Sequence, residues 1–291
     1  MMHEDKVKGQ IRHFYDQVGW QKEADGYFQN ARYEDLRPVS SEYIHRCHLR
    51  VKRYLKPSGD YLLDAGSGPV QYDEYLTYSE NYNFRVCMDL SIVALKEARQ
   101  RLPEKGLCVV ADIARLPFKP EAFDGIVSLH TIHHVPIEQK MDVYAGLYKC
   151  LKPGSSMVTV DGWNEVPLQR AMNLLMAAAS KLRRRSEKHV AEIHTAMDEK
   201  SVTQNSASNP APLGTYVLKT SANWFKQAMG SKLPYKILVW RSVSVKFLRT
   251  VIHPRSGGKF WLKILYRLEE WFPKYFGENG QYPIILIQKP E

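Results

Sequence analysis

The sequence predicts an α/β protein built on a parallel sheet, and three observations indicate it. First, short apolar runs are each followed by an aspartate, at Asp64, Asp89 and Asp112. Second, a segment that reads as a helix separates the first two runs, and another separates the second from the third. Third, 25 residues separate Asp64 from Asp89, as a strand–helix–strand unit requires. Because the carboxyl ends of parallel strands meet at one edge of the sheet, we expect the three acids to border a ligand-binding crevice.

The composition is that of a soluble globular protein with one large or two small domains: 291 residues, 44% hydrophobic and 25% charged. No uninterrupted apolar stretch approaches 18 residues, so we expect no transmembrane segment. Residues 1–6 are polar and lack the apolar core of a signal peptide, which favours a cytoplasmic location. The four cysteines form no C-x-x-C pair and are expected to be reduced and buried: Cys47, Cys87, Cys108 and Cys150.

The net charge is +10, and it is concentrated near the C-terminal end of the sequence. Between Arg241 and Phe276, eight lysines and arginines stand against two glutamates, which gives +6. A basic patch attracts nucleic acid, anionic lipid or an acidic small substrate. A solvated surface without a partner is the alternative interpretation.

Residues 1–59 are predicted to form helices that precede the sheet. Four apolar residues recur at helical spacing along one face: Ile44, Cys47, Val51 and Leu55. Two aromatic-rich stretches stand earlier, at 13–15 and 26–28. These helices either close over a bound ligand or simply pack on the sheet.

The stretch 61–71 predicts the first strand and the turn that organises the site. Two leucines lead into Asp64 and then into Gly66 and Gly68. Glycine accepts a positive φ and lets a ligand approach the backbone closely. We expect a helix to open directly behind this turn and to present its unpaired N–H groups. These features predict a nucleotide-type pocket.

The same stretch departs from the dinucleotide fingerprint G-x-G-x-x-G/A. Gln71 occupies the position of the third small residue, and that fingerprint has no use for Asp64. An NAD-dependent oxidoreductase is therefore disfavoured.

The second strand, 84–88, ends at Asp89, and the third covers 107–110. A carboxylate after strand two is suited to accept two hydrogen bonds from the vicinal hydroxyls of a ribose. The alternative is that Asp89 only caps the next helix. That helix is predicted over 92–101.

The fourth strand, 126–129, leads into a loop with three histidines, His130, His133 and His134. Imidazole is the side chain best matched to proton transfer near neutral pH. A metal site is disfavoured because no acid or cysteine stands close by in sequence. A helix up to residue 151 and a fifth strand, 157–161, follow.

After Trp163 the pattern changes. The sequence predicts a helix over 168–182, a loop over 201–212, a short helix over 221–229, a strand over 235–240, a helical stretch over 259–276 and a last strand over 284–287. At least half of the large apolar residues in the stretch 259–276 are expected in the core: Trp261, Leu265, Leu268, Trp271 and Phe272. An acceptor-site wall or a membrane-facing surface is the alternative.

Several motifs resemble those of class I S-adenosylmethionine (SAM)-dependent methyltransferases, in particular the type 11 methyltransferase domain family. The pattern D-x-G-x-G at Asp64 resembles the family's first motif, and D-x-S at Asp89 resembles its second. The segments 111–118 and 123–136 resemble A-D-(A/I)-x-x-L-P-F and the F-D-x-I/V-x-S pattern that leads to H-H-V-P. The resemblance covers about 60–163, and it departs from the family at Val70, where a third glycine is usual.

The resemblance implies a Rossmann-like sheet, mostly parallel with an antiparallel last strand, with N-terminal helices and a helical insert as a cap. It divides the chain into an N-terminal cap (1–59), a SAM-binding core (60–163), a substrate cap (164–230) and a part that completes the sheet (231–291). It implies SAM as cofactor, S-adenosylhomocysteine as product, and these cofactor-binding residues: Asp64, Gly66, Gly68, Asp89, Leu90, Asp112, Ile113, Leu129 and His130.

Among these residues, Asp112 would accept a hydrogen bond from the exocyclic amine of adenine. His133 stands where related O-methyltransferases have a proposed general base, so it is the candidate catalytic residue. The alternative is that His133 and His134 shape the loop or cap the next helix, since methyl transfer from a sulfonium is often driven by positioning alone.

The leading hypothesis is methyl transfer to the O, N or C atom of a small or lipophilic acceptor by in-line displacement. A second hypothesis is an RNA or DNA substrate, prompted by the basic charge. However, the loop after strand four is not of the N/D-P-P-Y type, and no Pro-Cys nucleophile is present. A third is a non-catalytic SAM-binding protein. Peripheral membrane contact is a further possibility for the basic C-terminal region.

Overall fold

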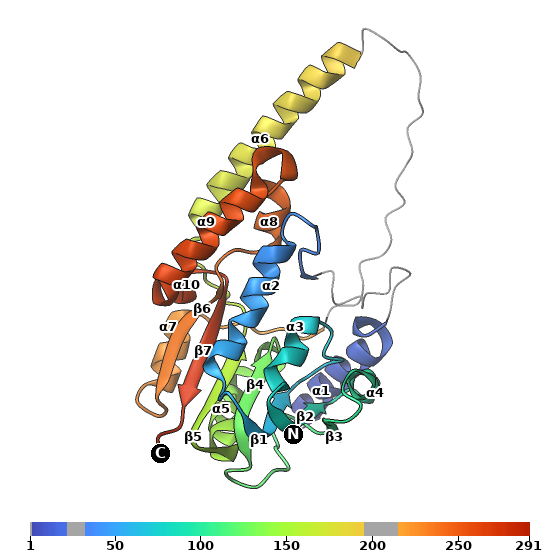
Figure 1. Ribbon diagram of the computed structural model, residues 1–291, viewed down its shortest axis with the longest axis vertical. Helices are drawn as coiled ribbons and strands as arrows, with labels where there is room; N and C mark the ends of the chain where they lie inside the picture. The colour runs from blue at the N-terminus through green and yellow to red at the C-terminus, as the bar shows by residue number, and fades with distance from the viewer. Residues whose placement is uncertain (1, 22–32, 195–214) are drawn as a thin grey trace.

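The computed structural model describes residues 2–21, 33–194 and 215–291, and they contain a sheet of seven strands (Figure 1). The aromatic stretch 26–28 and the loop predicted over 201–212 lie outside the described residues. The strands are β1 Gly59–Ala65, β2 Tyr82–Asp89, β3 Gly106–Val110, β4 Phe123–Leu129, β5 Leu151–Val160, β6 Tyr235–Arg241 and β7 Tyr282–Gln288.

The strand order is β3-β2-β1-β4-β5-β7-β6. The first five strands pair in parallel, whereas β7 is antiparallel to both β5 and β6. The predicted Rossmann-like sheet with an antiparallel last strand is therefore confirmed. All five parallel strands were expected from their apolar runs.

Successive residues of the inner strands point to opposite faces of the sheet, as the pleat requires. Leu63 and Ile126 pack with α5 on one face, whereas Leu62 and Val127 pack with α4 on the other. The helices are α1 Met2–Phe14, α2 Ser41–Leu49, α3 Asp73–Leu76, α4 Ile92–Arg101, α5 Ile137–Cys150, α6 Gln169–His194, α7 Ala222–Met229, α8 Val245–Val251, α9 Gly258–Trp271 and α10 Pro273–Asn279.

Helix α4 has the predicted bounds, and Ser91 caps it by accepting a hydrogen bond from the backbone N–H of Ala94. The helix expected directly behind Gly68 is wrong in position. Residues 69–72 are irregular, and α3 begins at Asp73 with only four residues. Its N–H groups therefore start further from the glycine turn than predicted. Helix α8 was not predicted.

A third hydrophobic cluster joins α2, α6, α8 and α9 beyond the end of the sheet. The predicted apolar stripe of residues 44–55 is buried, and Cys47 and Ile44 belong to this cluster. Cys108 contradicts the expectation of buried cysteines, since it is exposed on the edge strand β3.

The expected core role of the large apolar residues in 259–276 is wrong. Trp261, Trp271 and Phe272 are 57%, 70% and 56% exposed, and the two leucines are only partly buried. The helix α9 instead buries the side chains of Leu262, Tyr266 and Glu269, which recur at helical spacing on its other side. None of the helices in the described part of the chain is long and apolar enough to cross a membrane.

Candidate functional site

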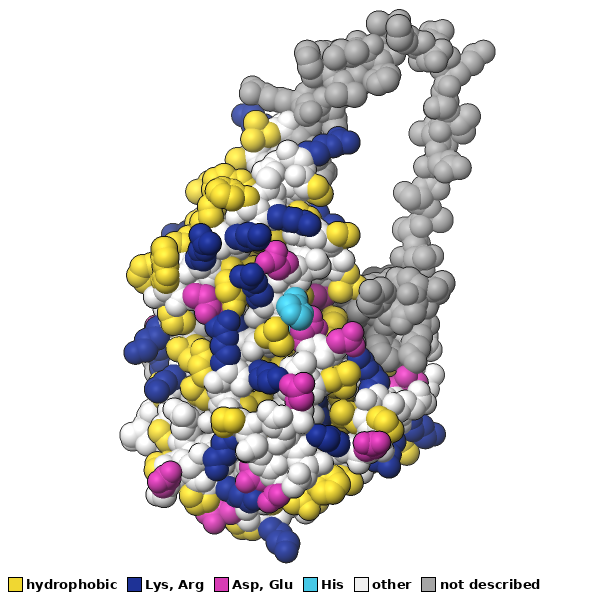
Figure 2. Space-filling view, viewed as in Figure 1, with side chains coloured by type: hydrophobic (Ala, Val, Ile, Leu, Met, Phe, Trp, Pro, Cys, Tyr) yellow, Lys and Arg dark blue, Asp and Glu magenta, His cyan; other side chains and the backbone are white. Residues whose placement is uncertain are grey.

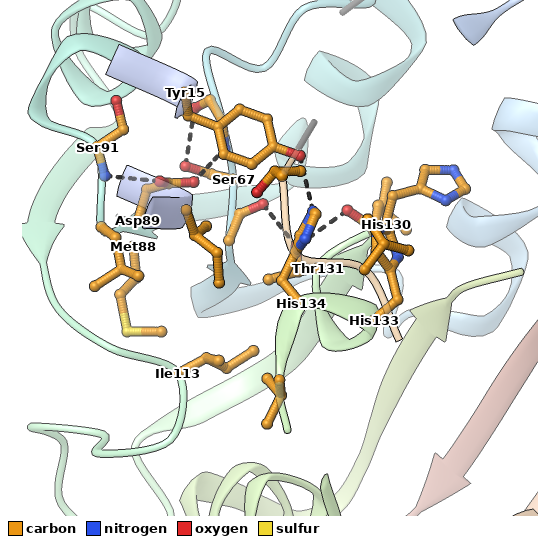
Figure 3. Close-up of a pocket in the computed structure, with 18 of the residues that line it drawn as sticks. Tyr15, Ser67, Met88, Asp89, Ser91, Ile113, His130, Thr131, His133 and His134 are labelled. Carbon is orange, nitrogen blue, oxygen red and sulfur yellow. Dashed lines mark hydrogen bonds between the residues drawn. The ribbon is translucent and has the colours of Figure 1, made fainter. Parts of the chain in front are cut away.

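A cavity of about 470 Å³ opens at the carboxyl ends of β1 to β4 (Figure 3). The structure brings all ten residues proposed from the sequence to its wall: Asp64, Gly66, Gly68, Asp89, Leu90, Asp112, Ile113, Leu129, His130 and His133. The volume lies in the range of small-molecule and cofactor sites. The shared location of the ten residues agrees with a common function, while the role of each residue stays a prediction.

The turn after β1 requires its two glycines. Gly66 and Gly68 have φ angles of +77° and +52°, which disfavour any residue with a Cβ. A Cβ on Gly66 would lie 2.2 Å from Cγ2 of Thr131, and one on Gly68 would lie 2.9 Å from the Trp20 ring. Val70, where the related family usually has glycine, also has a positive φ of 53°. All three positions of the turn therefore have a positive φ, although only two of them are glycines.

Asp89 closes this turn from the neighbouring strand. Its carboxylate accepts hydrogen bonds from the backbone N–H groups of Gly68 and Ser91, both at 2.9 Å. Burial raises the pKa of Asp89 to about 6, although these two hydrogen bonds favour the charged form. Since each carboxylate oxygen has two lone pairs, acceptor sites remain for a ligand. The Ser91 hydroxyl caps α4, so Asp89 is not needed for that role.

The third aspartate faces the N-terminal helix. Asp112 accepts a hydrogen bond from the backbone N–H of Ala114 and pairs with the Lys8 ammonium of α1 at 2.5 Å. Immediately after α1, the Asp16 carboxylate accepts a hydrogen bond from the Ser91 hydroxyl at 2.5 Å. The N-terminal segment thus contacts the loop after β3 through Lys8 and the loop after β2 through Asp16.

Asp64 lines the cavity but is also paired within the sheet. Its side chain is nearly fully buried, and its Oδ2 accepts hydrogen bonds from the guanidinium of Arg85 on β2. Part of its acceptor capacity is therefore used within the sheet.

The histidine loop contains three imidazoles in different environments. The Tyr15 hydroxyl lies 2.8 Å from Nε2 of His134, and Nδ1 of His134 lies 2.6 Å from the carbonyl oxygen of Tyr216. The carbonyl fixes Nδ1 as a donor, so Nε2 accepts from the tyrosine. Burial lowers the pKa values of His130 and His134 to about 3 each. Both imidazoles are therefore neutral near pH 7.

His133 is held by an acid that the sequence analysis did not single out. Nδ1 of His133 lies 2.5 Å from Oδ1 of Asp161. Burial by itself would raise the pKa of Asp161, but the adjacent His133 outweighs it and lowers that pKa. Asp161 directly follows β5, so the strand-end rule applied to the other acids would have found it.

The far end of the cavity is built from distant segments. Arg241 of β6 pairs with Glu34 and lies 4.7 Å from the centre of the Tyr282 ring. The Lys219 ammonium lies 6.0 Å from the same ring. Burial would raise the pKa of Glu34, but Arg241 and His48 lower it to about 2. No local sequence pattern connects these residues, so the sequence analysis missed them.

Residues 63–159 match the family described as "Methyltransferase domain". This segment of the chain is thus a methyltransferase domain.

Curated relatives match the chain over half of its length or less. An uncharacterized methyltransferase from Geobacillus sp. (strain WCH70) is 36% identical over 66 residues, which cover 23% of this chain and 31% of the relative. The mouse 18S rRNA (guanine-N(7))-methyltransferase is 29% identical over 50% of this chain and 51% of its own length. The malonyl-[acyl-carrier protein] O-methyltransferase of Legionella pneumophila is 33% identical over 35% and 36%. The chain thus spans between a third and a half of these relatives.

Solved structures resemble the fold over nearly the whole chain. Geranyl diphosphate C-methyltransferase from Streptomyces coelicolor A3(2) has a TM-score of 0.52 at 15% identity, with 97% of both chains covered. Phosphoethanolamine N-methyltransferase 2 from Haemonchus contortus has a TM-score of 0.55 at 14% identity, with 97% of this chain and 60% of that chain covered. At this identity the likeness shows the fold.

The methyltransferase domain contains all ten site residues that the sequence predicted, since they lie between 64 and 133. Glu34, Asp161, Lys219 and Arg241 lie outside the matched segment. The cavity wall therefore combines residues of the methyltransferase domain with residues outside the matched segment, among them Glu34, Lys219 and Arg241. Within the described residues, no three histidine, cysteine or acidic side chains are grouped to hold a metal ion.

Proposed function

We propose that the protein is a SAM-dependent methyltransferase that acts on a small or lipophilic acceptor. The observation that carries this proposal is the convergence of Gly66, Gly68, Asp89 and Asp112 on one cavity. His133, which Asp161 holds through its Nδ1, lines the same cavity. The glycines leave room where a Cβ would collide, and the carboxylates keep acceptor sites for hydroxyl and amine groups. These features fit an adenosine-bearing cofactor.

The residues of the methyltransferase domain that line the cavity each have a role in this proposal. Asp89 accepts from the ribose hydroxyls, and Asp112 with Ile113 borders the adenine ring. Leu90, Leu129 and His130 complete the wall around the adenosine. Asp64, oriented by Arg85, supports the turn below the amino-acid part of the cofactor.

Bound SAM supplies a methyl group already activated on a sulfonium, so the protein mainly provides alignment and a dry site. For a hydroxyl or amine acceptor, His133 adds proton removal. Its Nδ1–H donates to Asp161, which leaves Nε2 as the nitrogen able to accept the acceptor's proton. The Asp161 carboxylate then stabilises the imidazolium that forms.

The N-terminal segment 1–59 and the insert 164–230 act as caps over the site. Lys8, Tyr15, Thr215 and Lys219 support this role because they line the same cavity. Aromatic side chains of Tyr72, Tyr75 and Tyr282 also line it and suit a lipophilic acceptor.

An RNA acceptor is the second candidate, favoured by the net charge of +10. Four of the curated relatives are named as rRNA or tRNA methyltransferases, including the mouse 18S rRNA enzyme.

The test has two steps. Calorimetry with S-adenosylhomocysteine and with NADH should detect binding of the first and not of the second. Transfer of a labelled methyl group should then be measured for a panel of quinones, lipids, small phenols and total RNA, with His133→Ala beside the wild type. Transfer to RNA alone would select the second candidate, and cofactor binding without any transfer would favour a non-catalytic protein.

A further inference from the structure

An aromatic face covers the outer side of α9 and the start of α10. It consists of five side chains that are between 53% and 70% exposed: Phe260, Trp261, Trp271, Phe272 and Tyr275. Exposed apolar side chains of this size are unusual when they gather in one place. Figure 2 shows hydrophobic side chains interspersed with lysines and arginines along the edge of the molecule that α6, α9 and α10 form.

The outer side of α9 is apolar although the fold does not need it to be. Phe260, Ile264 and Trp271 share one side of the helix by their spacing. The side chains of Leu262, Tyr266 and Glu269 point the other way and are buried. Helix α9 therefore has an apolar stripe toward the core and a second one toward the outside.

The charges around the aromatic face are positive. Lys259, Lys263, Arg267 and Lys274 are exposed on the same two helices. The two acids of α9 are already paired with arginines of the same chain. Glu269 pairs with Arg50, and Glu270 pairs with Arg50 and Arg53.

Few of these cations are balanced by acids of the chain. Lys263 lies 3.8 Å from Glu42. Among the residues that the structure describes, no carboxylate forms an ion pair with Lys259, Arg267 or Lys274. The aromatic face thus carries a positive charge available to an external partner.

Helix α6 extends this surface. Leu174, Leu175 and Leu182 are 73%, 54% and 67% exposed. The only charged residues of the segment 169–182 are Arg170 and Lys181, both positive. Buried methionines of α6 pack in the same cluster as α9, so the two helices belong to one part of the molecule.

We propose that the aromatic face binds the surface of an anionic lipid bilayer. Tryptophan and tyrosine partition to the headgroup region, and lysine or arginine beside them adds attraction to anionic lipid. An acidic protein would match the cations but would leave the exposed rings without a partner. Nucleic acid would call for a basic groove rather than for a ridge of leucine, phenylalanine and tryptophan. This proposal is independent of the methyl transfer proposed above.

The test is sedimentation of the full-length protein with two kinds of vesicle. One consists of phosphatidylcholine alone, and the other contains about 30% phosphatidylglycerol, which gives the bilayer a moderate negative charge. We expect binding to the anionic vesicles that weakens at least tenfold when salt is raised from 50 to about 300 mM. Phe260→Ser with Trp271→Ser should reduce binding about tenfold or more, and Lys259→Gln with Lys274→Gln should do the same.

Matched controls keep the test independent of folding. Tyr61→Ser with Phe84→Ser changes an exposed ring pair on β1 and β2, and Lys96→Gln with Lys236→Gln removes two lysines elsewhere. Both should bind vesicles as the wild type does, and every variant should retain its circular dichroism spectrum and melting temperature. Equal binding by all variants, or no vesicle binding at all, would overturn the proposal. So would a concentration-dependent dimer or an RNA complex that depends on the aromatic face while vesicles do not bind.

Discussion

The imidazole of His133 and the carboxylate of Asp161 lie 2.5 Å apart, Nδ1 to Oδ1, and are contributed by the ends of two adjacent strands. His133 belongs to the loop after β4, and Asp161 directly follows β5. Because β4 and β5 pair in parallel, the pair is a direct result of the sheet order. It resembles the histidine–acid arrangement of general-base catalysis.

If His133 removes a proton from the acceptor, its replacement should affect the chemical step. We expect His133→Ala to lower kcat by about 10²- to 10³-fold and Asp161→Asn to lower it by about tenfold or more. The dissociation constant for S-adenosylhomocysteine should change less than about threefold, because neither residue is assigned to the cofactor. His253→Ala, far along the sequence, is the control. An unchanged kcat for His133→Ala would mean that alignment alone drives transfer.

Cofactor affinity should depend on the charge of Asp89. Its pKa is raised to about 6 by burial, so the carboxylate is ionised above this pH and protonated below it. Protonation removes acceptor sites for the ribose, so the dissociation constant for S-adenosylhomocysteine should rise as the pH falls below 6. The limit is about tenfold per pH unit if only the ionised form binds.

The comparison for this prediction is Asp89→Asn, which cannot ionise. It should bind more weakly at pH 8 and should show little pH dependence between 5 and 8. Calorimetry at five pH values would check both curves, and a wild-type affinity that stays flat through pH 6 would exclude a ribose-binding role for the ionised Asp89.

The glycine turn should not tolerate a side chain. Gly66→Ala requires a positive φ of 77° and places a Cβ 2.2 Å from Thr131, so the turn must shift. We expect loss of measurable S-adenosylhomocysteine binding and a cost to stability of about 1–3 kcal/mol. Gly9→Ala on α1 has no heavy atom within 4 Å of the new Cβ and should bind normally. Binding and thermal melts of the two variants provide the check.

The buried pair of Glu34 and Arg241 should contribute to stability in acid. The pKa of Glu34 is about 2, below its ordinary value of 4.5. The stabilisation is therefore fully present above pH 4.5 and is lost as the pH falls from 4.5 toward 2. Arg241→Met leaves Glu34 buried without its cation, and should lower the free energy of unfolding by about 3–5 kcal/mol near neutral pH.

A surface pair provides the contrast. Lys226 and Glu278 form a partly exposed ion pair near the surface, so Lys226→Met should cost no more than about 1 kcal/mol. Urea denaturation at pH 7 and pH 3 would measure all of these values. Similar losses for Arg241→Met and Lys226→Met would contradict the assignment of a structural role to the buried pair.

The parallel half of the sheet was predictable because its strands read as short apolar runs, which in the inner strands β1, β2 and β4 are largely buried on both faces. The site residues of these strands followed from the rule that strand ends share one edge. The same rule applies to Asp161, which was overlooked because no motif of the related family drew attention to it.

The remaining site residues were not predictable from local patterns. Glu34 and Arg241 meet because β6 is placed at the edge of the sheet next to β7. This contact depends on the strand order, which the spacing of residues along the sequence does not reveal. Helix α9 was misjudged for a different reason. Its apolar residues form two stripes, and a periodic pattern alone does not tell which stripe faces the core.

The strand β7 lies between β5 and β6, although it is made after both of them. Those two strands do not pair with each other, so until β7 has left the ribosome β6 has no partner strand and β5 is paired only with β4. Tyr282, which lines the cavity beside Arg241, arrives with that strand. During synthesis, the part of the cavity formed by the methyltransferase domain can therefore assemble early, while the part beside Tyr282 and Arg241 is completed only with the last strand of the sheet.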